Sequence, residues 1–246
     1  MPVLLMTVWL TGCVQEELGS TPSPTGNGIR FTLTVPDVNL PSVSSRTMTG
    51  TGTAKKEDEI ETVDILVFDM SKTPAVFLEW ASATEVTQDL ADNSTVSFSA
   101  VLSPTTASTC IVVVSNKELD NIVPGFIKGT TTKVEAMEKM LHAQTGKWLA
   151  DGSTTGGYTR IPMYGEKVIS KITPSMDPIT GINMKRMLAR IDIRNNSATS
   201  NFTVEEVYLA NYNTTGYIAP AWNTNGQVTD PAPDTPVLPV NSGKMT

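Results

Sequence analysis

The feature that most constrains the fold is a succession of short apolar runs with the patterns of β-strands. Residues Ile29–Val35 alternate without exception between apolar and polar side chains. Its apolar face consists of Ile29, Phe31, Leu33 and Val35. This period of two predicts a strand with one buried face. The centre of Ile60–Asp69 is instead apolar on both faces, and Thr109–Ser115 is a near-continuous β-branched run, which predicts central strands buried between two layers.

Further segments complete the pattern of a β protein. Strands are predicted at Val76–Trp80, Thr95–Leu102, Met187–Arg194 and Phe202–Leu209. The first of these is expected to pair with Ile60–Asp69, whereas Ile161–Glu166 is expected to form a short edge or turn segment. Several short strands separated by turn residues predict a mainly β chain, folded as an antiparallel β-sandwich.

One segment has the pattern of a helix. Thr132 and Glu135 have the spacing of a capping box, in which each side chain accepts a backbone hydrogen bond from the other residue. The helical spacing of Val134, Met137 and Leu141 predicts one buried stripe. His142 falls at the expected end of this helix, where the helix dipole favours a cation.

The N-terminus carries a short apolar run, Val3–Leu10, followed by Thr11, Gly12 and Cys13. A run of this length is typical of a signal peptide and too short to cross a bilayer, which takes about 20 residues. Leu10–Cys13 resembles a bacterial lipobox, which implies that Cys13 is lipidated and residues 1–12 are removed. The alternative is an apolar N-terminus that contains a cysteine by chance.

Two stretches have the composition of solvated chain. Residues 13–27 are rich in Pro, Gly, Ser and Thr, as in a flexible tether. Ser42–Glu59 is almost free of apolar residues and predicts a long exposed loop that contains Arg46. Proteases cut most readily in such loops. Arg30 competes as a cleavage site, but it lies within a predicted strand.

Composition and residue types exclude several classes of function. The net charge of −7 disfavours nucleic acid as a partner. A catalytic triad would need His142, the single histidine, and the Cys/His ligands of a zinc site are lacking. If Cys13 is acylated, Cys110 remains alone in a β-branched run, as a buried apolar residue. We therefore expect no enzyme, no cofactor, no metal and no disulfide.

The order of these motifs is similar to that of the Bacteroidales-type fimbrillins, the subunits of type V pili. The similarity rests on the lipobox, the alternating strand, the arginine in a loop, Ile60–Asp69, Ile161–Glu166 and Arg186–Ile193. It implies a transthyretin-like sandwich, export as a lipoprotein of the outer membrane, and cleavage by an arginine-specific protease between Arg46 and Thr47. It also implies that the strand Ile29–Val35 leaves and that a strand of a neighbouring fimbrial subunit replaces it.

The expected organisation has four parts. Residues 1–12 are the signal peptide, 13–27 the tether, and 28–195 an N-terminal fimbrillin domain whose residues 28–46 are a removable propeptide. Residues 196–246 are expected to begin a second sandwich domain that is incomplete.

Two functions are compatible with the sequence. The first is a structural subunit of a cell-surface fimbria that is assembled by strand exchange and supports adhesion. The alternative is a monomeric surface lipoprotein that binds glycan or host protein, through Tyr212, Tyr217 and Trp222, since aromatic rings suit sugar stacking. These aromatic residues also fit the core of the incomplete second domain.

Overall fold

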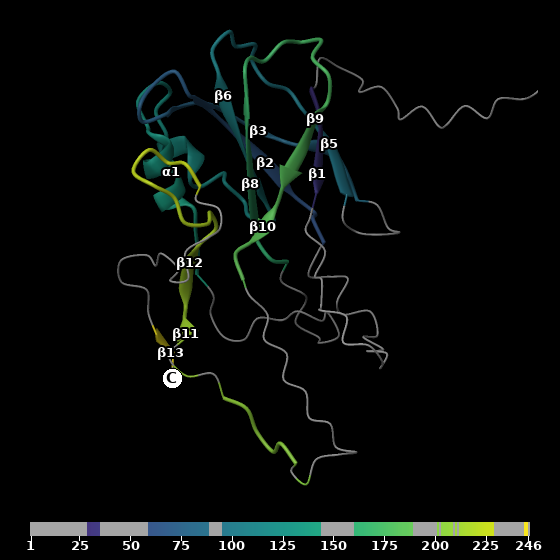
Figure 1. Cartoon of the computed structure of the whole chain (residues 1–246), viewed down its shortest axis with the longest axis vertical. Helices are drawn as coiled ribbons and strands as arrows, with labels where there is room; N and C mark the ends of the chain where they lie inside the picture. The colour runs from purple at the N-terminus through teal and green to yellow at the C-terminus, as the bar shows by residue number, and fades with distance from the viewer. Residues whose placement is uncertain are drawn as a thin grey trace, which may run out of the picture.

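The fold was analysed in a computed structural model of the whole chain (Figure 1). The structure describes residues 29–34, 59–88, 95–143, 160–188, 201, 203–208, 210, 212–228 and 244–245. The described part is mainly β and contains one α-helix, as the sequence predicts.

One sheet has four strands and contains the alternating segment that opens the described chain. Its strands are, in spatial order, β4 (Thr84–Gln88), β5 (Thr95–Ala100), β1 (Ile29–Thr34) and β9 (Ile179–Asn183). Neighbouring strands are antiparallel except β1 and β9, which run parallel. The sheet therefore departs from a purely antiparallel arrangement at its β9 edge.

The other sheet has five strands and is antiparallel throughout. Its order is β10 (Lys185–Arg186), β8 (Met163–Ile169), β6 (Thr109–Ser115), β2 (Val63–Asp69) and β3 (Val76–Ser82). β6 is buried along its whole length and β2 along all but its last residue. The prediction that these two apolar runs are central strands is confirmed, as is the pairing of β3 with β2.

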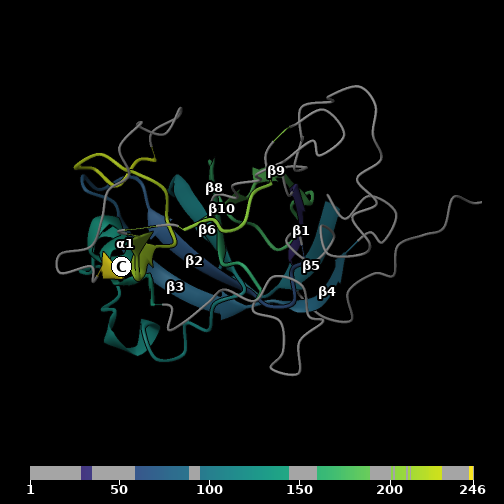
Figure 2. The same cartoon turned by 90° about the horizontal axis from the view of Figure 1, so that it is seen from below.

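The five-stranded sheet carries a core on each of its faces. On one face it packs against the four-stranded sheet, with Ile65, Val67, Ile111 and Val113 pointing inward. On the other face the alternate residues meet a layer of helix and chain (Figure 2). That layer contains the 3₁₀-helix η2 (Val123–Gly125), the helix α1 (Lys133–Lys139) and residues 218–228.

Short strand pairs lie beside this outer layer. β7 (Leu141–Ala143) pairs with β12 (Thr215–Tyr217), and β11 (Tyr212–Asn213) pairs with β13 (Lys244–Met245). Ile218 and Ala219 are buried against the face that carries α1. The segment around them therefore packs on the sandwich.

At two places one strand runs almost directly into a strand of the other sheet. β3 continues into β4 around Ala83, and β9 continues into β10 around Met184. Each junction is held by a backbone hydrogen bond, from Ala83 N–H to Val63 O and from Met184 N–H to Thr34 O. These crossings tie both edges of the sandwich together, which fixes how the two sheets face each other.

Two local predictions were wrong. The segment predicted as an edge or turn, Ile161–Glu166, contributes to β8, an interior strand between β6 and β10. Pro162 lacks a backbone N–H donor, but it lies just outside the β6–β8 ladder, which begins at Met163. The proline therefore does not interrupt the pairing of β8. Residues 203–208, predicted as a strand, form neither helix nor strand, and are exposed. A segment of β-favouring residues becomes a strand only beside another strand, and none pairs with these residues in the described chain.

The helix begins as predicted but ends earlier. The capping box of Thr132 and Glu135 is present, with both reciprocal hydrogen bonds. The predicted stripe was partly wrong, because the buried residues are Lys133, Ala136, Met137 and Met140. α1 ends at Lys139, and Leu141 and His142 belong to β7, whose backbone pairs with β12. His142 is therefore a strand residue and not a helix-terminal cation.

The close approach of the sheets at Gly165 gives a test of this packing. A Cβ there would lie 2.7 Å from Met184 Sδ and 2.8 Å from Ile182 Cγ2. Gly165→Ala should therefore lower the free energy of unfolding by about 1–3 kcal/mol, because a branched side chain must shift. Gly125→Ala, where a Cβ meets nothing within 4 Å, is the control. Urea denaturation measures both, and an equal effect of the two substitutions would contradict the observed packing.

Candidate functional site

The strand β1 occupies an interior position in the four-stranded sheet. It pairs with β5 over six residues, from Ile29 opposite Ala100 to Thr34 opposite Thr95. On its other side it pairs with β9 at Phe31, Leu33 and Thr34, with a register irregularity between Phe31 and Leu33. Backbone groups on both sides of β1 therefore engage neighbouring strands, although β1 belongs to the part of the chain that precedes every other described element.

The side chains of β1 alternate as the sequence predicts. Ile29, Phe31 and Leu33 point into the sandwich and are at most 4 % exposed. The Phe31 ring stacks on Phe98 of β5, with centroids 4.9 Å apart and planes 5° from parallel. Phe31 lies directly opposite Phe98 in the register, so this stack lies near the middle of the β1–β5 ladder. We call the place that β1 occupies between β5 and β9 the seat of β1.

Of the remaining predicted site residues, one lies within the described part of the chain and the others lie outside it. Cys13, Val35, Arg46 and Thr47 lie outside the described residues. Arg30 is in β1, half-buried and opposite Ser99. The structure therefore places three of the four residues of the exchangeable strand and the competing arginine.

A buried ion pair that the sequence analysis missed lies on the opposite side of the five-stranded sheet. Lys133 is 2 % exposed, and its Nζ lies 2.6 Å from Glu166 Oε2. The same oxygen accepts a hydrogen bond of 2.6 Å from the Tyr164 hydroxyl. Burial and the nearby carboxylate raise the pKa of Tyr164 well above its usual range, so the phenol stays a donor. This network is satisfied within the protein.

The start of α1 explains why a lysine is buried here. Thr132 caps the helix, and the Lys133 N–H donates to Ala75 O in the segment before β3. This anchor directs the Lys133 side chain toward β8. With Ala136, Met137 and Met140, Lys133 completes the spacing i, i+3, i+4, i+7 of a buried helix face. The sequence contains this spacing, but it predicts the buried face only if Lys133 is counted among the buried residues.

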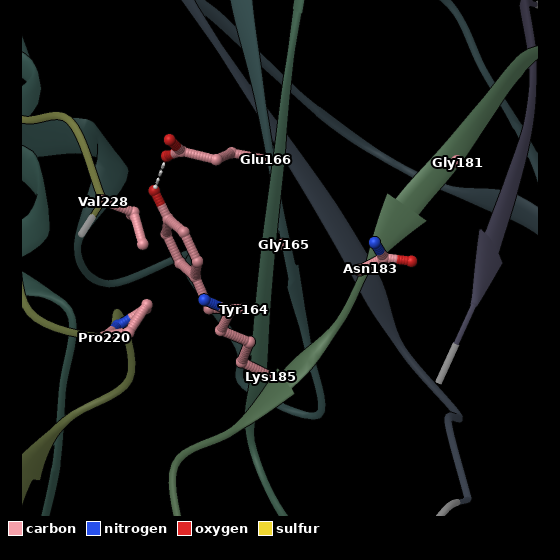
Figure 3. A pocket seen from close by; sticks show the side chains of 8 residues that line it. All are labelled: Tyr164, Gly165, Glu166, Gly181, Asn183, Lys185, Pro220 and Val228. Carbon is pink, nitrogen blue, oxygen red and sulfur yellow. Dashed lines mark hydrogen bonds between the residues drawn. The ribbon is translucent and has the colours of Figure 1, made fainter. Parts of the chain in front are cut away.

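A small polar pocket of about 220 Å³ lies beside this network (Figure 3). Its lining comes from β8, β9 and β10 and from the C-terminal segment: Tyr164, Gly165, Glu166, Gly181, Asn183, Lys185, Pro220 and Val228. Pro220 and Val228 lie beside the Tyr164 ring, whose hydroxyl is turned to Glu166. Because Lys133 already pairs with Glu166, the carboxylate presents no uncompensated charge to the pocket.

The described residues give little support to catalysis or metal binding. Burial raises the pKa of the Cys110 thiol to about 11, so this cysteine is a protonated core residue. No group of three or more His, Cys, Asp or Glu side chains within the described chain could hold a metal ion.

The aromatic residues considered for sugar stacking pack mainly on the protein itself. Tyr217 and Trp222 form an edge-to-face pair with centroids 5.0 Å apart. Trp222 also packs against the core beneath α1. Both rings are half-buried, so each gives part of its surface to this packing.

Comparison with known proteins places this fold. The sequence model of the family "Major fimbrial subunit protein (FimA)" matches residues 29–183, which is more than half of the chain. The chain belongs to this fimbrial subunit family. The match begins at the first residue of β1 and ends at the last residue of β9, so the FimA model spans every strand of the four-stranded sheet.

A solved structure and the curated proteins complete the comparison. A fimbrial assembly protein from Parabacteroides distasonis is similar at 13 % identity, with a TM-score of 0.42 over 83 % of this chain and 72 % of that chain. No match is found among curated proteins.

Membership of the FimA family sets the broad function. The chain is a structural subunit of a cell-surface fimbria, a non-enzymatic kind of protein that assembles with other fimbrial subunits. Among the described residues, no helix has both the length and the apolar character to span a membrane.

The seat of β1 can be tested through its central aromatic residue. Phe31→Ala removes the stack on Phe98 and leaves a cavity between the sheets, so the free energy of unfolding should fall by about 3–5 kcal/mol. Arg30→Ala, on the outer face of the same strand, should change it by less than about 1 kcal/mol. Equal effects of the two substitutions in urea denaturation would mean that β1 is not seated as described.

Proposed function

We propose that this fimbrial subunit is exported as a lipoprotein, cut after Arg46, and assembled when a strand of another subunit replaces β1. The observation that carries the proposal is the place of β1, an interior strand supplied by the part of the chain that comes before all the rest of the sandwich. Adhesion is the role of the finished fimbria.

Loss of β1 would create a specific template for another strand. β5 would lose six backbone partners and β9 three, and both would then present unpaired N–H and C=O groups. Between them the seat of three buried side chains, Ile29, Phe31 and Leu33, would open. Unpaired strand edges beside an apolar groove can bind an added strand. The backbone of that strand supplies the hydrogen bonds, and its alternate side chains fill the groove.

The choice of Arg46 over Arg30 follows from the backbone requirements of proteolysis. Arg30 is paired to Ser99 inside the sheet and half-buried, so a protease reaches it only after β1 unfolds. Arg46 lies in a stretch of small polar residues, the composition at which chains are cut most readily. A cut there leaves Thr47 as the new N-terminus and separates β1 from the remaining strands.

The lipid on Cys13 has a temporary role in this scheme. Residues 1–12 direct export, residues 13–27 tether the precursor to the outer membrane, and residues 28–46 leave as a propeptide. Cleavage after Arg46 discards lipid, tether and β1 together. A subunit that is never cut keeps its anchor and its own strand, and would serve only at the base of a fimbria.

Lipidation can be tested with the two cysteines of the chain. In cells fed a labelled fatty acid, the precursor should incorporate label through Cys13, and Cys13→Ser should abolish incorporation. Cys110→Ser is the matched control and should leave the label unchanged, because Cys110 is buried in β6. Persistent labelling of Cys13→Ser would contradict the lipoprotein assignment.

Processing can be tested on the purified precursor with an arginine-specific protease. The first cut should fall between Arg46 and Thr47, as read by N-terminal sequencing, and Arg46→Ala should remove it. Arg30→Ala is the control and should leave the first cut in place. In the presence of a donor-competent subunit, the cut protein should form a ladder of stable oligomers on gels. Cut protein that stays monomeric under these conditions would contradict strand exchange.

A further inference from the structure

The strand β9 forms one wall of the seat of β1, and its place in the sheet depends on β1. In the described chain β1 is the only strand that pairs with β9, whereas β5, the other wall, also pairs with β4. The backbone hydrogen bond from Met184 N–H, just after β9, is likewise made to Thr34 O of β1. When β1 leaves, β9 therefore loses the sheet partner that the described chain gives it, and β5 keeps one.

The middle of β9 contains a β-bulge. Between Phe31 and Leu33 of β1 the register shifts, and Thr180 and Gly181 of β9 have no partner there. Gly181 has a φ of +71°, a conformation that glycine adopts without steric cost. A bulge of this kind leaves backbone groups of the bulged strand outside the ladder, where other groups bond to them.

A lysine of the five-stranded sheet bonds to this bulge. Lys167 of β8 is half-buried, and its Nζ donates a hydrogen bond to Thr180 O. Because side chains alternate along a strand, Lys167 lies on the same face of β8 as Gly165. At Gly165 the two strands come so close that a Cβ would lie 3.1 Å from Asn183 O. β8 therefore contacts β9 at its bulge and at its last residue, beside the pocket of Figure 3.

These contacts differ from the apolar contacts of β9 in what they fix. Ile179 and Ile182 are buried in the core between the sheets, and this burial does not require β1 alone. Apolar packing is non-directional, so it holds β9 against the sandwich without fixing its register. A hydrogen bond from Lys167 to one carbonyl oxygen fixes that register, because donor and acceptor must lie within about 3.2 Å of each other.

We propose that Lys167 positions β9 as the second wall of the emptied seat, so that the seat keeps its shape between the departure of β1 and the arrival of the incoming strand. The proposal rests on strand replacement as the mode of assembly. Lys167 and Thr180 both follow the cut after Arg46, so their hydrogen bond stays with the sandwich when β1 is released. Lys167 is a positioning residue, because it acts on the incoming strand through β9.

The consequence for binding follows from the fraction of sandwiches whose seat is formed. When only that fraction is competent, the apparent affinity for a strand falls in proportion to it. Lys167→Met keeps a long apolar stem and removes the donor. With β1 in place, the β1–β9 pairs hold β9 in both proteins, so the two proteins should differ in the formation of the seat only when it is empty.

Dissociation of the cut chain tests this. The recognition sequence of a site-specific protease replaces residues 44–49 of the precursor, whose N-terminus carries a fluorophore. After cutting, fluorescence anisotropy over a dilution series gives the Kd of the released part for the sandwich. All variants are measured at one urea concentration, below the unfolding transition of each uncut chain.

Lys167→Met should raise this Kd about tenfold, as expected if about one emptied sandwich in ten keeps β9 in place. Lys167→Arg keeps a side-chain donor and should restore most of the affinity. Lys171→Met is the matched control, because Lys171 is an exposed lysine of the segment between β8 and β9, and it should leave the Kd unchanged.

Urea denaturation of the uncut chains separates positioning from a general structural role. A merely structural hydrogen bond would be lost equally from the filled and the emptied sandwich, so Lys167→Met would lower the stability of the uncut chain and leave the Kd unchanged. That result would overturn the proposal and leave strand replacement standing. A released part that stays bound at every dilution would show that β1 does not leave. Strand replacement would then fail, and the role of Lys167 in an emptied seat would fail with it.

Discussion

The pairing of β2 with β6 is the constraint on which the rest of the structure depends. The two strands share a ladder of seven residues, from Val63 opposite Ser115 to Asp69 opposite Thr109. Their side chains alternate between two cores, so that Ile65 and Val67 face the second sheet and Leu66 and Phe68 face the layer that contains α1. With neither face in water, the pair can only lie in the middle layer, and both outer layers take their position from it.

The two outer layers differ in how they are attached. The helical side is held by apolar packing and by the Lys133–Glu166 pair, whose charge is compensated by a contact of 2.6 Å and by the Tyr164 hydroxyl. Removing one member of such a buried pair costs far more than the pair contributes, because the other charge stays buried. The four-stranded sheet is held at β4 and β9 by the chain crossings around Ala83 and Met184. Among the described strands of that sheet, β1 is the first in the chain.

This difference connects the fold with fimbrial assembly. A subunit that exchanges a strand needs a sandwich that keeps its shape after the strand has gone. Here the middle layer, the outer layer that contains α1 and the crossing around Ala83 are built from residues 59–228, none of which belongs to β1. The crossing around Met184 also uses Thr34 O of β1, so this hydrogen bond would be lost with the strand. Within the sandwich Phe31 of β1 stacks on Phe98, a ring that belongs to β5.

The sequence by itself determined the strands whose pattern is local. Alternation in Ile29–Thr34 and the largely apolar runs in β2 and β6 follow from which side chains face a core. The capping box at Thr132 is a contact between neighbours in the chain. Only the tertiary structure decided where these elements lie. The parallel pairing of β1 with β9, the interior position of β8 and the burial of Lys133 each depend on a partner more than 30 residues away. The segment at 203–208 shows the converse, because its Thr, Val and Tyr residues favour a strand but it finds no neighbouring strand in the described chain. Which strands pair across a sheet depends on contacts between distant parts of the chain. Local sequence patterns predict which residues form a strand, but they do not say which strand pairs with it.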